Sequence, residues 1–172
     1  MTNKLFHFFS FLLIVAVLDT SRAFSAINKQ EAVEIGGIKQ WIGIKGINDH
    51  NPVLLFLHGG PGNSSMRYGD RFTSELQKHF VVVQWDQRES GKTAKLNSSN
   101  QPITVALMVS DAVEMINYLR ARFSKEKIYL MGHSWGGFLG LMVAVSHPDL
   151  LEAYFAVSPM VHQAESERLS LE

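Results

Sequence analysis

The hexapeptide Gly-His-Ser-Trp-Gly-Gly at positions 132–137 restricts the fold strongly, because it lies between an expected strand and an expected helix. Before it, residues 127–131 are short and mostly apolar, which is typical of a buried strand. After it, residues 138–146 are rich in apolar side chains and contain no proline, as a packed helix requires. A serine at such a junction is pushed out of the sheet. The pattern therefore predicts a nucleophile elbow with Ser134 as the nucleophile.

The residues around this serine also suit the chemistry. Gly132 and Gly136 leave room for a strained backbone between them. The backbone N–H of Trp135 would lie in the first turn of the helix, where unpaired amides and the helix dipole favour a developing oxyanion. A chance match to Gly-x-Ser-x-Gly is the alternative, and the position between strand and helix argues against it.

A second glycine-rich motif follows the fully apolar run at residues 53–57, which suits a central parallel strand. The motif consists of His58, Gly59 and Gly60, then a proline and another glycine. Its backbone can approach a substrate closely, and the N–H of Gly60 can complete an oxyanion hole with that of Trp135. We expect His58 and Gly59 to shape this loop. The plainer interpretation is an ordinary Gly/Pro turn after a strand.

These two motifs and the block Trp-Asp-Gln-Arg-Glu-Ser-Gly-Lys-Thr at residues 85–93 occur in an order and at intervals that resemble the proline iminopeptidase group of α/β-hydrolases. The resemblance covers about residues 31–164. It implies a serine aminopeptidase that releases N-terminal proline or similar small residues from peptides. One departure is Glu89, at a position where that group usually has glycine after Asp-Gln-Arg.

The same block contains Gly-Lys-Thr at residues 91–93, which ends like a phosphate-binding loop. The glycine required five positions earlier is replaced by Asp86, so phosphate binding is excluded. We expect Asp86 and Arg88 to serve structure, in an ion-paired turn at the end of a strand.

A serine nucleophile needs a histidine as base and a carboxylate that orients it, and in α/β-hydrolases both follow the serine, acid first. His147 lies about 20 Å along the expected helix and suits a helix C-terminus. His162 follows an expected strand at residues 151–157, but no acid and histidine come after it in the required order. We therefore expect the acid and base of the triad not to be in this chain, and the chain to be the N-terminal part of a longer hydrolase.

Alternating strands and helices predict an α/β-hydrolase fold, with a mostly parallel sheet covered by helices on both faces. The expected elements are a hairpin at residues 32–47 that turns near Gly36 and Gly37, strands at 53–57, 80–85, 127–131 and 151–157, and a helix at 105–123 capped by Thr104. The expected strands are about two fewer than the usual eight of an α/β-hydrolase sheet, so we expect the helical cap domain and the last strands to be absent from this chain.

The N-terminus has a signal-peptide pattern, since Lys4 is followed by a nearly continuous apolar stretch at residues 5–18. The stretch is too short to span a bilayer comfortably, so we expect cleavage after Ala23 or Ser25 rather than a membrane anchor. We divide the chain into a signal peptide at 1–25, the N-terminal part of the hydrolase core at 26–164, and the start of a cap or linker at 165–172. The expected location is secreted or periplasmic.

Composition limits the remaining choices. The 172 residues are 46% hydrophobic, enough for one core, and their zero net charge without a basic face gives no support for nucleic-acid binding. The absence of cysteine excludes disulfides and a thiol nucleophile. No spacing resembles a metal site, and no cofactor is expected. The expected substrate is a peptide or a small ester or amide, with an esterase or lipase-like hydrolase, or a truncated non-catalytic chain, as the alternatives.

Overall fold

The computed structural model describes residues 25–98, 101–162, 165 and 168. Nearly all of the expected signal peptide, and most of the expected start of a cap, lie outside these residues. The elements in chain order are β1 (Ile27–Ile35), β2 (Ile38–Gly46), β3 (Val53–Leu57), α1 (Asp70–Thr73), the 3₁₀ turn η1 (Leu76–Lys78), β4 (Val81–Asp86), α2 (Gly91–Leu96), α3 (Val105–Phe123), β5 (Ile128–His133), α4 (Trp135–Ser146), the 3₁₀ turn η2 (Pro148–Leu150) and β6 (Leu151–Val157).

The strands form one six-stranded sheet in the order β1-β2-β4-β3-β5-β6. The first hairpin is antiparallel and β2 joins β4 antiparallel, whereas β4, β3, β5 and β6 run parallel. Gly36 and Gly37 form the hairpin turn with φ of 58° and 71°, a conformation that favours glycine. The mostly parallel sheet confirms the predicted fold class. The first strand begins at Ile27, earlier than the predicted position 32.

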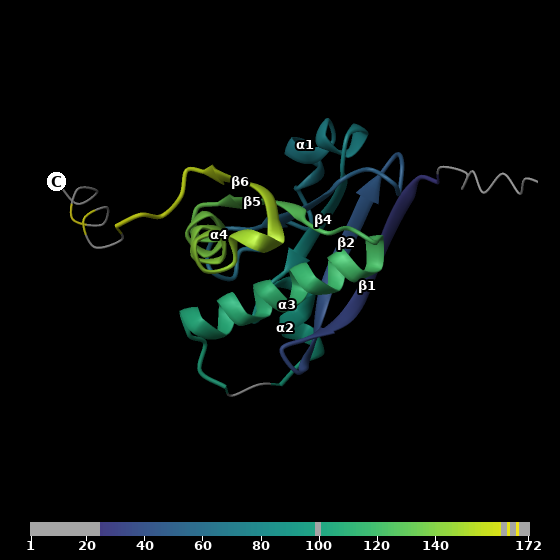
Figure 1. Ribbon diagram of the computed structural model, residues 1–172. Helices are drawn as coiled ribbons and strands as arrows, with labels where there is room; N and C mark the ends of the chain where they lie inside the picture. Colours follow the sequence, from purple (N-terminus) through teal and green to yellow (C-terminus); the bar gives the residue numbers. More distant parts are fainter. Residues whose placement is uncertain (1–24, 99–100, 163–164, 166–167, 169–172) are drawn as a thin grey trace, which may run out of the picture.

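Helices cover both faces of this sheet (Figure 1). Leu55 and Leu57 of β3 belong to a buried core that also includes the inner side chains of α3 and α4. Phe56 points to the opposite face, where its ring lies 5.1 Å from that of Phe72 in α1, measured between centroids. Strands β3 and β4 are buried at every residue, as expected of central parallel strands, and β3 is a continuous apolar run.

Helix α3 has the predicted limits and cap. The hydroxyl of Thr104 accepts a hydrogen bond from the N–H of Leu107 at 3.1 Å. Its inner face carries Met108, Ala112, Ile116 and Leu119, which are fully buried. Val105 in the first turn does not belong to this face, since it is 40% exposed.

A buried ion pair attaches α3 to the hairpin. Arg88 donates from Nε to Asp111 Oδ2 at 2.9 Å and from Nη2 to Oδ1 at 3.0 Å, and Nη2 also donates to the carbonyl of Gly36 at 3.0 Å. Asp86 instead accepts hydrogen bonds from the Ser64 hydroxyl and, at 2.8 Å, from the backbone N–H of Lys92. The expected ion pair therefore joins Arg88 to a helix, and the expectation that it forms within the turn is wrong.

Apolar side chains remain exposed on the outer sides of α4 and β6. Val145 is 73% exposed and Phe155 is 49% exposed. Sheets of this type are normally covered on both faces, so this surface marks where the described residues leave the sheet open. Among the described residues, no helix is both long and apolar enough to cross a bilayer.

Candidate active site

Ser134 forms the junction between β5 and α4 in a conformation that side chains rarely adopt. Its φ is 55° and its ψ is −117°, and it is half-buried rather than enclosed in regular structure. Such strain costs on the order of 1–3 kcal/mol and persists only where the surroundings impose it. Here the N–H of Ser134 donates to the carbonyl of Val157 at 3.0 Å, while its carbonyl accepts from the N–H groups of Gly137 and Phe138 at 2.9 and 3.1 Å.

The flanking glycines allow this turn because no Cβ fits at either position. A Cβ on Gly132 would lie 2.1 Å from the carbonyl oxygen of Gly136. A Cβ on Gly136 would lie 2.1 Å from the carbonyl oxygen of Leu57 and 2.7 Å from that of His58. Backbone therefore packs directly on backbone, and the start of α4 is held against the end of β3.

The glycine-rich loop after β3 runs beside the elbow. A Cβ on Gly59 would lie 3.2 Å from the Cβ of Ser134, so this loop residue is in near contact with the serine. Gly60 is exposed and has a φ of 121°, and its carbonyl precedes a cis proline. The structure thus brings the two predicted motifs together at the carboxyl ends of β3 and β5, where parallel α/β sheets bind their ligands.

His58 is buried under this loop as a neutral ring. The backbone N–H of Gln87 can only donate, so its contact with Nε2 of His58 at 3.2 Å leaves the proton on Nδ1, 2.8 Å from the carbonyl of Gly59. The hydroxyl of Ser90 also lies 3.0 Å from Nε2. Burial lowers the pKa of His58, although its contact with Gly59 acts in the opposite direction. With both nitrogens engaged, this histidine braces the loop and is not placed to act as a base.

Sequence reasoning missed two further residues that lie beneath the site. The side chain of Gln87 donates from Nε2 to the carbonyl of His58 at 3.1 Å and accepts at Oε1 from Nε1 of Trp135 at 3.3 Å. The hydroxyl of Ser90 donates to the carbonyl of Gln87 at 2.7 Å. Both residues belong to the block at 85–93, and the resemblance of that block to the proline iminopeptidase group was the available signal that they lie near the site.

Three other histidines flank the serine or follow it in the chain. His147 ends α4, whose 12 residues correspond to about 18 Å of helix. His162 is exposed beyond β6 and accepts a hydrogen bond at Nδ1 from the N–H of Glu165 at 3.0 Å. His133 precedes the serine and lines a neighbouring cavity. Within the described part of the chain, no group of three or more His, Cys, Asp or Glu side chains could hold a metal ion.

The cavity beside the elbow has a volume of about 370 Å³ and lies on the face of the sheet that carries α1. Its lining is mainly apolar and consists of Phe56, His58, Gly59, Ser65, Tyr68, Phe72, Met131, His133 and Val157. An apolar hollow with a few polar groups next to a strained serine is a typical setting for a small organic substrate.

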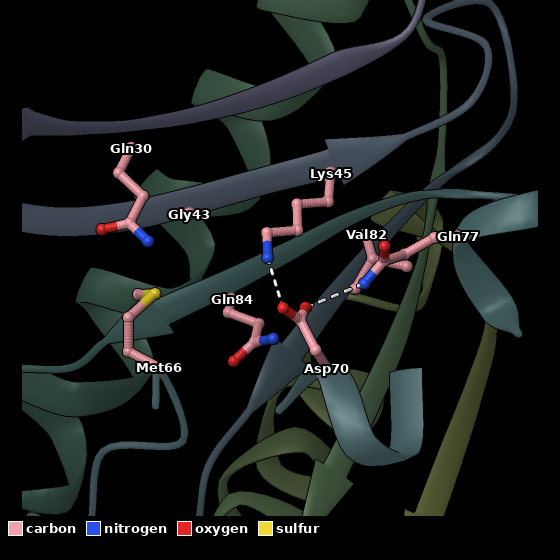
Figure 2. Close-up of a pocket in the computed structure, with 8 residues that line it drawn as sticks. All are labelled: Gln30, Gly43, Lys45, Met66, Asp70, Gln77, Val82 and Gln84. Carbon is pink, nitrogen blue, oxygen red and sulfur yellow. Dashed lines mark hydrogen bonds and ion pairs between the residues drawn. The ribbon is translucent and has the colours of Figure 1, made fainter. Parts of the chain in front are cut away.

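A second cavity is much smaller and lies between α1 and strands β2 and β4 (Figure 2). Lys45 forms an ion pair there with Asp70, and Nε2 of Gln77 donates to the same carboxylate at 3.0 Å. The hydrogen bond from Lys45 lowers the pKa of Asp70. With about 10 Å³, the cavity has room for roughly one water molecule, so these contacts attach α1 to the sheet rather than form a binding site.

Comparisons with known proteins agree with this geometry. The family model of the alpha/beta hydrolase fold matches residues 52–170. A Bacillus subtilis protein named "Probable aminopeptidase YbaC" is 41% identical over 135 residues, covering 78% of this chain and 42% of that protein. The crystal structure of a proline iminopeptidase-related protein from Thermus thermophilus has 25% identity and a TM-score of 0.66, covering 79% of this chain and 46% of that chain. The crystal structure of an epoxide hydrolase from Vigna radiata has 26% identity and a TM-score of 0.63, covering 75% of this chain and 38% of that chain.

The chain belongs to the α/β-hydrolase fold family. Within that family, the predicted resemblance to the proline iminopeptidase group is confirmed by relatives that carry aminopeptidase and iminopeptidase names. The chain spans less than half the length of the relatives described above. The six strands of the described residues correspond to part of the fold of these relatives.

Proposed function

We propose that this chain is the nucleophile-bearing part of a serine hydrolase, and that the complete protein is an aminopeptidase that removes N-terminal proline or a similar small residue from peptides. The observation that carries the proposal is the conformation of Ser134, with φ of 55° at a strand-to-helix turn that only glycine neighbours permit. The similarity to aminopeptidase and iminopeptidase relatives supports the substrate class.

In the proposed reaction, Oγ of Ser134 attacks the carbonyl carbon of the substrate. The backbone N–H groups of Gly60 and Trp135 donate hydrogen bonds to the resulting oxyanion. A histidine from beyond the described residues, oriented by an acid, accepts the serine proton and returns it to the leaving amine. Water then releases the acyl group and restores the serine. Because Ser134 occupies the elbow, the proposal excludes a reaction that begins with a carboxylate nucleophile there.

The test compares two substrates on the protein translated from the complete reading frame. Hydrolysis of a prolyl arylamide should exceed that of a short-chain ester, and Ser134→Ala should abolish both. A strong preference for the ester would favour an esterase, a rival supported by the mainly apolar cavity beside the elbow. The 172-residue chain alone should be inactive, because we propose that its base and acid come from elsewhere. Activity in that chain would contradict this part of the proposal.

We also propose that residues 1–25 direct export and are removed. The proposal rests on the positively charged start and apolar stretch of the sequence. N-terminal sequencing of the mature protein should begin after Ala23 or Ser25. A protein that retains Met1 and stays with the cytoplasmic fraction would refute export.

A further inference from the structure

The side-chain amide of Gln87 joins the two elements that carry the proposed oxyanion donors. Its Nε2 donates to the carbonyl of His58, two residues before Gly60, and its Oε1 accepts from the indole of Trp135. Gln87 is 1% exposed, so water does not compete for these bonds. We propose that Gln87 is a positioning residue that holds the N–H groups of Gly60 and Trp135 in register, an inference that rests on the proposed function of Ser134.

The position needs an amide because it needs one donor and one acceptor at the same end of a side chain. The His58 carbonyl requires a donor, and the Trp135 indole, which can only donate, requires an acceptor. Leucine supplies neither, and an ionised glutamate supplies only the acceptor. Loss of the amide would leave two buried polar groups without their partner, which favours movement of the loop and the helix start away from each other.

The backbone of Gln87 is itself held in place. Its N–H donates to Nε2 of His58, and its carbonyl accepts from both the N–H of Ser90 at 3.0 Å and the hydroxyl of Ser90 at 2.7 Å. Glu89 closes this turn with a φ of 58°. The side chain therefore extends from a fixed turn to two elements that already touch, since a Cβ on Gly136 would collide with the His58 carbonyl.

The chemistry is sensitive to this register because oxyanion donors act only at about 2.7–3.1 Å from the developing charge, and a displacement of about 1 Å can cost about 10²-fold in rate. Donors that bind the transition state more strongly than the ground state affect kcat rather than KM. Gln87→Leu should therefore lower kcat for a prolyl arylamide by about 10- to 100-fold and leave KM within about threefold.

Gln40 provides a matched control. It is also a fully buried glutamine that accepts from a tryptophan, Nε1 of Trp85 at 2.8 Å. Its own Nε2 donates to the backbone carbonyl of Ile35 at 3.2 Å and to the carboxylate of Asp111 at 2.8 Å. It lies on β2, which β4 and β3 separate from β5 and the elbow. Gln40→Leu should lower the thermal unfolding temperature at least as much as Gln87→Leu, yet leave kcat per folded molecule unchanged. The concentration of active molecules is set by titration with a fluorophosphonate.

A second variant keeps the proposal testable if Gln87→Leu does not fold. Trp135→Phe removes the indole donor and keeps the backbone N–H, so it should lower kcat severalfold with KM retained. In the double variant the two losses should not multiply, because they break the same bridge. The proposal is overturned if Gln87→Leu, or Trp135→Phe in its place, keeps kcat within twofold while Ser134→Ala is inactive. If Ser134→Ala stays active, the proposed function fails, and the role of Gln87 fails with it.

Discussion

Replacement of Gly136 by alanine tests the contact between the elbow and the end of β3. The added Cβ would lie 2.1 Å from the carbonyl oxygen of Leu57, 2.6 Å from its carbonyl carbon and 2.7 Å from the carbonyl oxygen of His58. Real Cβ atoms keep more than 3.0 Å from such atoms. The helix start and the strand end must therefore separate by roughly 1 Å, with no flexible side chain to absorb the shift.

The size of the effect follows from that separation. Overpacking of a core typically costs about 1–3 kcal/mol, and a clash between backbone groups belongs at the upper limit, about 3 kcal/mol. For a chain of about 150–250 residues this corresponds to a loss of about 6–12 °C in unfolding temperature, and a longer complete protein should lose less. A shift of about 1 Å at the elbow should also lower kcat/KM by about 10²-fold.

The assay is thermal unfolding by circular dichroism, paired with arylamide kinetics on the complete protein. Gly140→Ala on the same helix is the control, because its Cβ meets the ring of Tyr154 at 2.5 Å, so a side chain rather than backbone must move, at the expense of the hydrogen bond from the Tyr154 hydroxyl to the carbonyl of Gly137. It should cost less than Gly136→Ala, about 1–2 kcal/mol in unfolding free energy, and leave kcat unchanged. A Gly136→Ala protein that is as stable and as active as the Gly140→Ala protein would refute the reasoning.

Three further predictions concern the surrounding scaffold. Glu89→Gly should raise the unfolding free energy by about 0.5–1 kcal/mol, because Glu89 has a positive φ and the relief of about 1–2 kcal/mol of backbone strain exceeds the entropic cost of glycine. A lower unfolding temperature in this variant would contradict the prediction. Asp111→Asn should lower the unfolding free energy, measured by urea titration, by about 3–5 kcal/mol because it leaves the buried Arg88 charge unpaired. Glu75→Gln, which breaks an exposed ion pair, should lower it by less than about 0.5 kcal/mol. Equal losses in the two variants would be inconsistent with the role assigned to the buried ion pair. Because burial lowers the pKa of His58 below 6.5, the unfolded chain binds a proton that the folded chain does not. Stability should therefore be complete above pH 6.5 and decline as pH falls from there toward the lowered pKa; His58→Gln should flatten this decline, and an unchanged slope would argue against it.

Much of the fold could be predicted because the strands are short apolar runs separated by helices and turns. Strands β3 and β6 and helix α3 have the predicted limits, and β4 and β5 begin one residue later than predicted. The start of β1 was missed because Ile27–Ile35 is largely polar, as an edge strand with one wet face can be. Its extent is set by pairing with β2, from Ile27 opposite Gly46 to Ile35 opposite Ile38.

The glycine patterns predicted where the elbow and the loop would lie, because positions with no room for a Cβ must be glycine and are therefore visible in the sequence. The side-chain contacts beneath them have no such local pattern. The bridge from Gln87 to His58 and Trp135 joins residues 29 and 48 positions apart. The partner of Arg88 is Asp111, on a helix where a carboxylate would ordinarily face solvent. Such pairings depend on how helices dock on the sheet, which local pattern does not encode.

Mapping a covalent label tests the central claim, that Ser134 is an activated nucleophile, most directly. The protein translated from the complete reading frame is treated with a fluorophosphonate, digested and analysed by mass spectrometry. The account predicts one adduct, on Oγ of Ser134, which is lost in Ser134→Ala together with hydrolytic activity. An adduct on another residue, or activity and labelling that survive in Ser134→Ala, would contradict it.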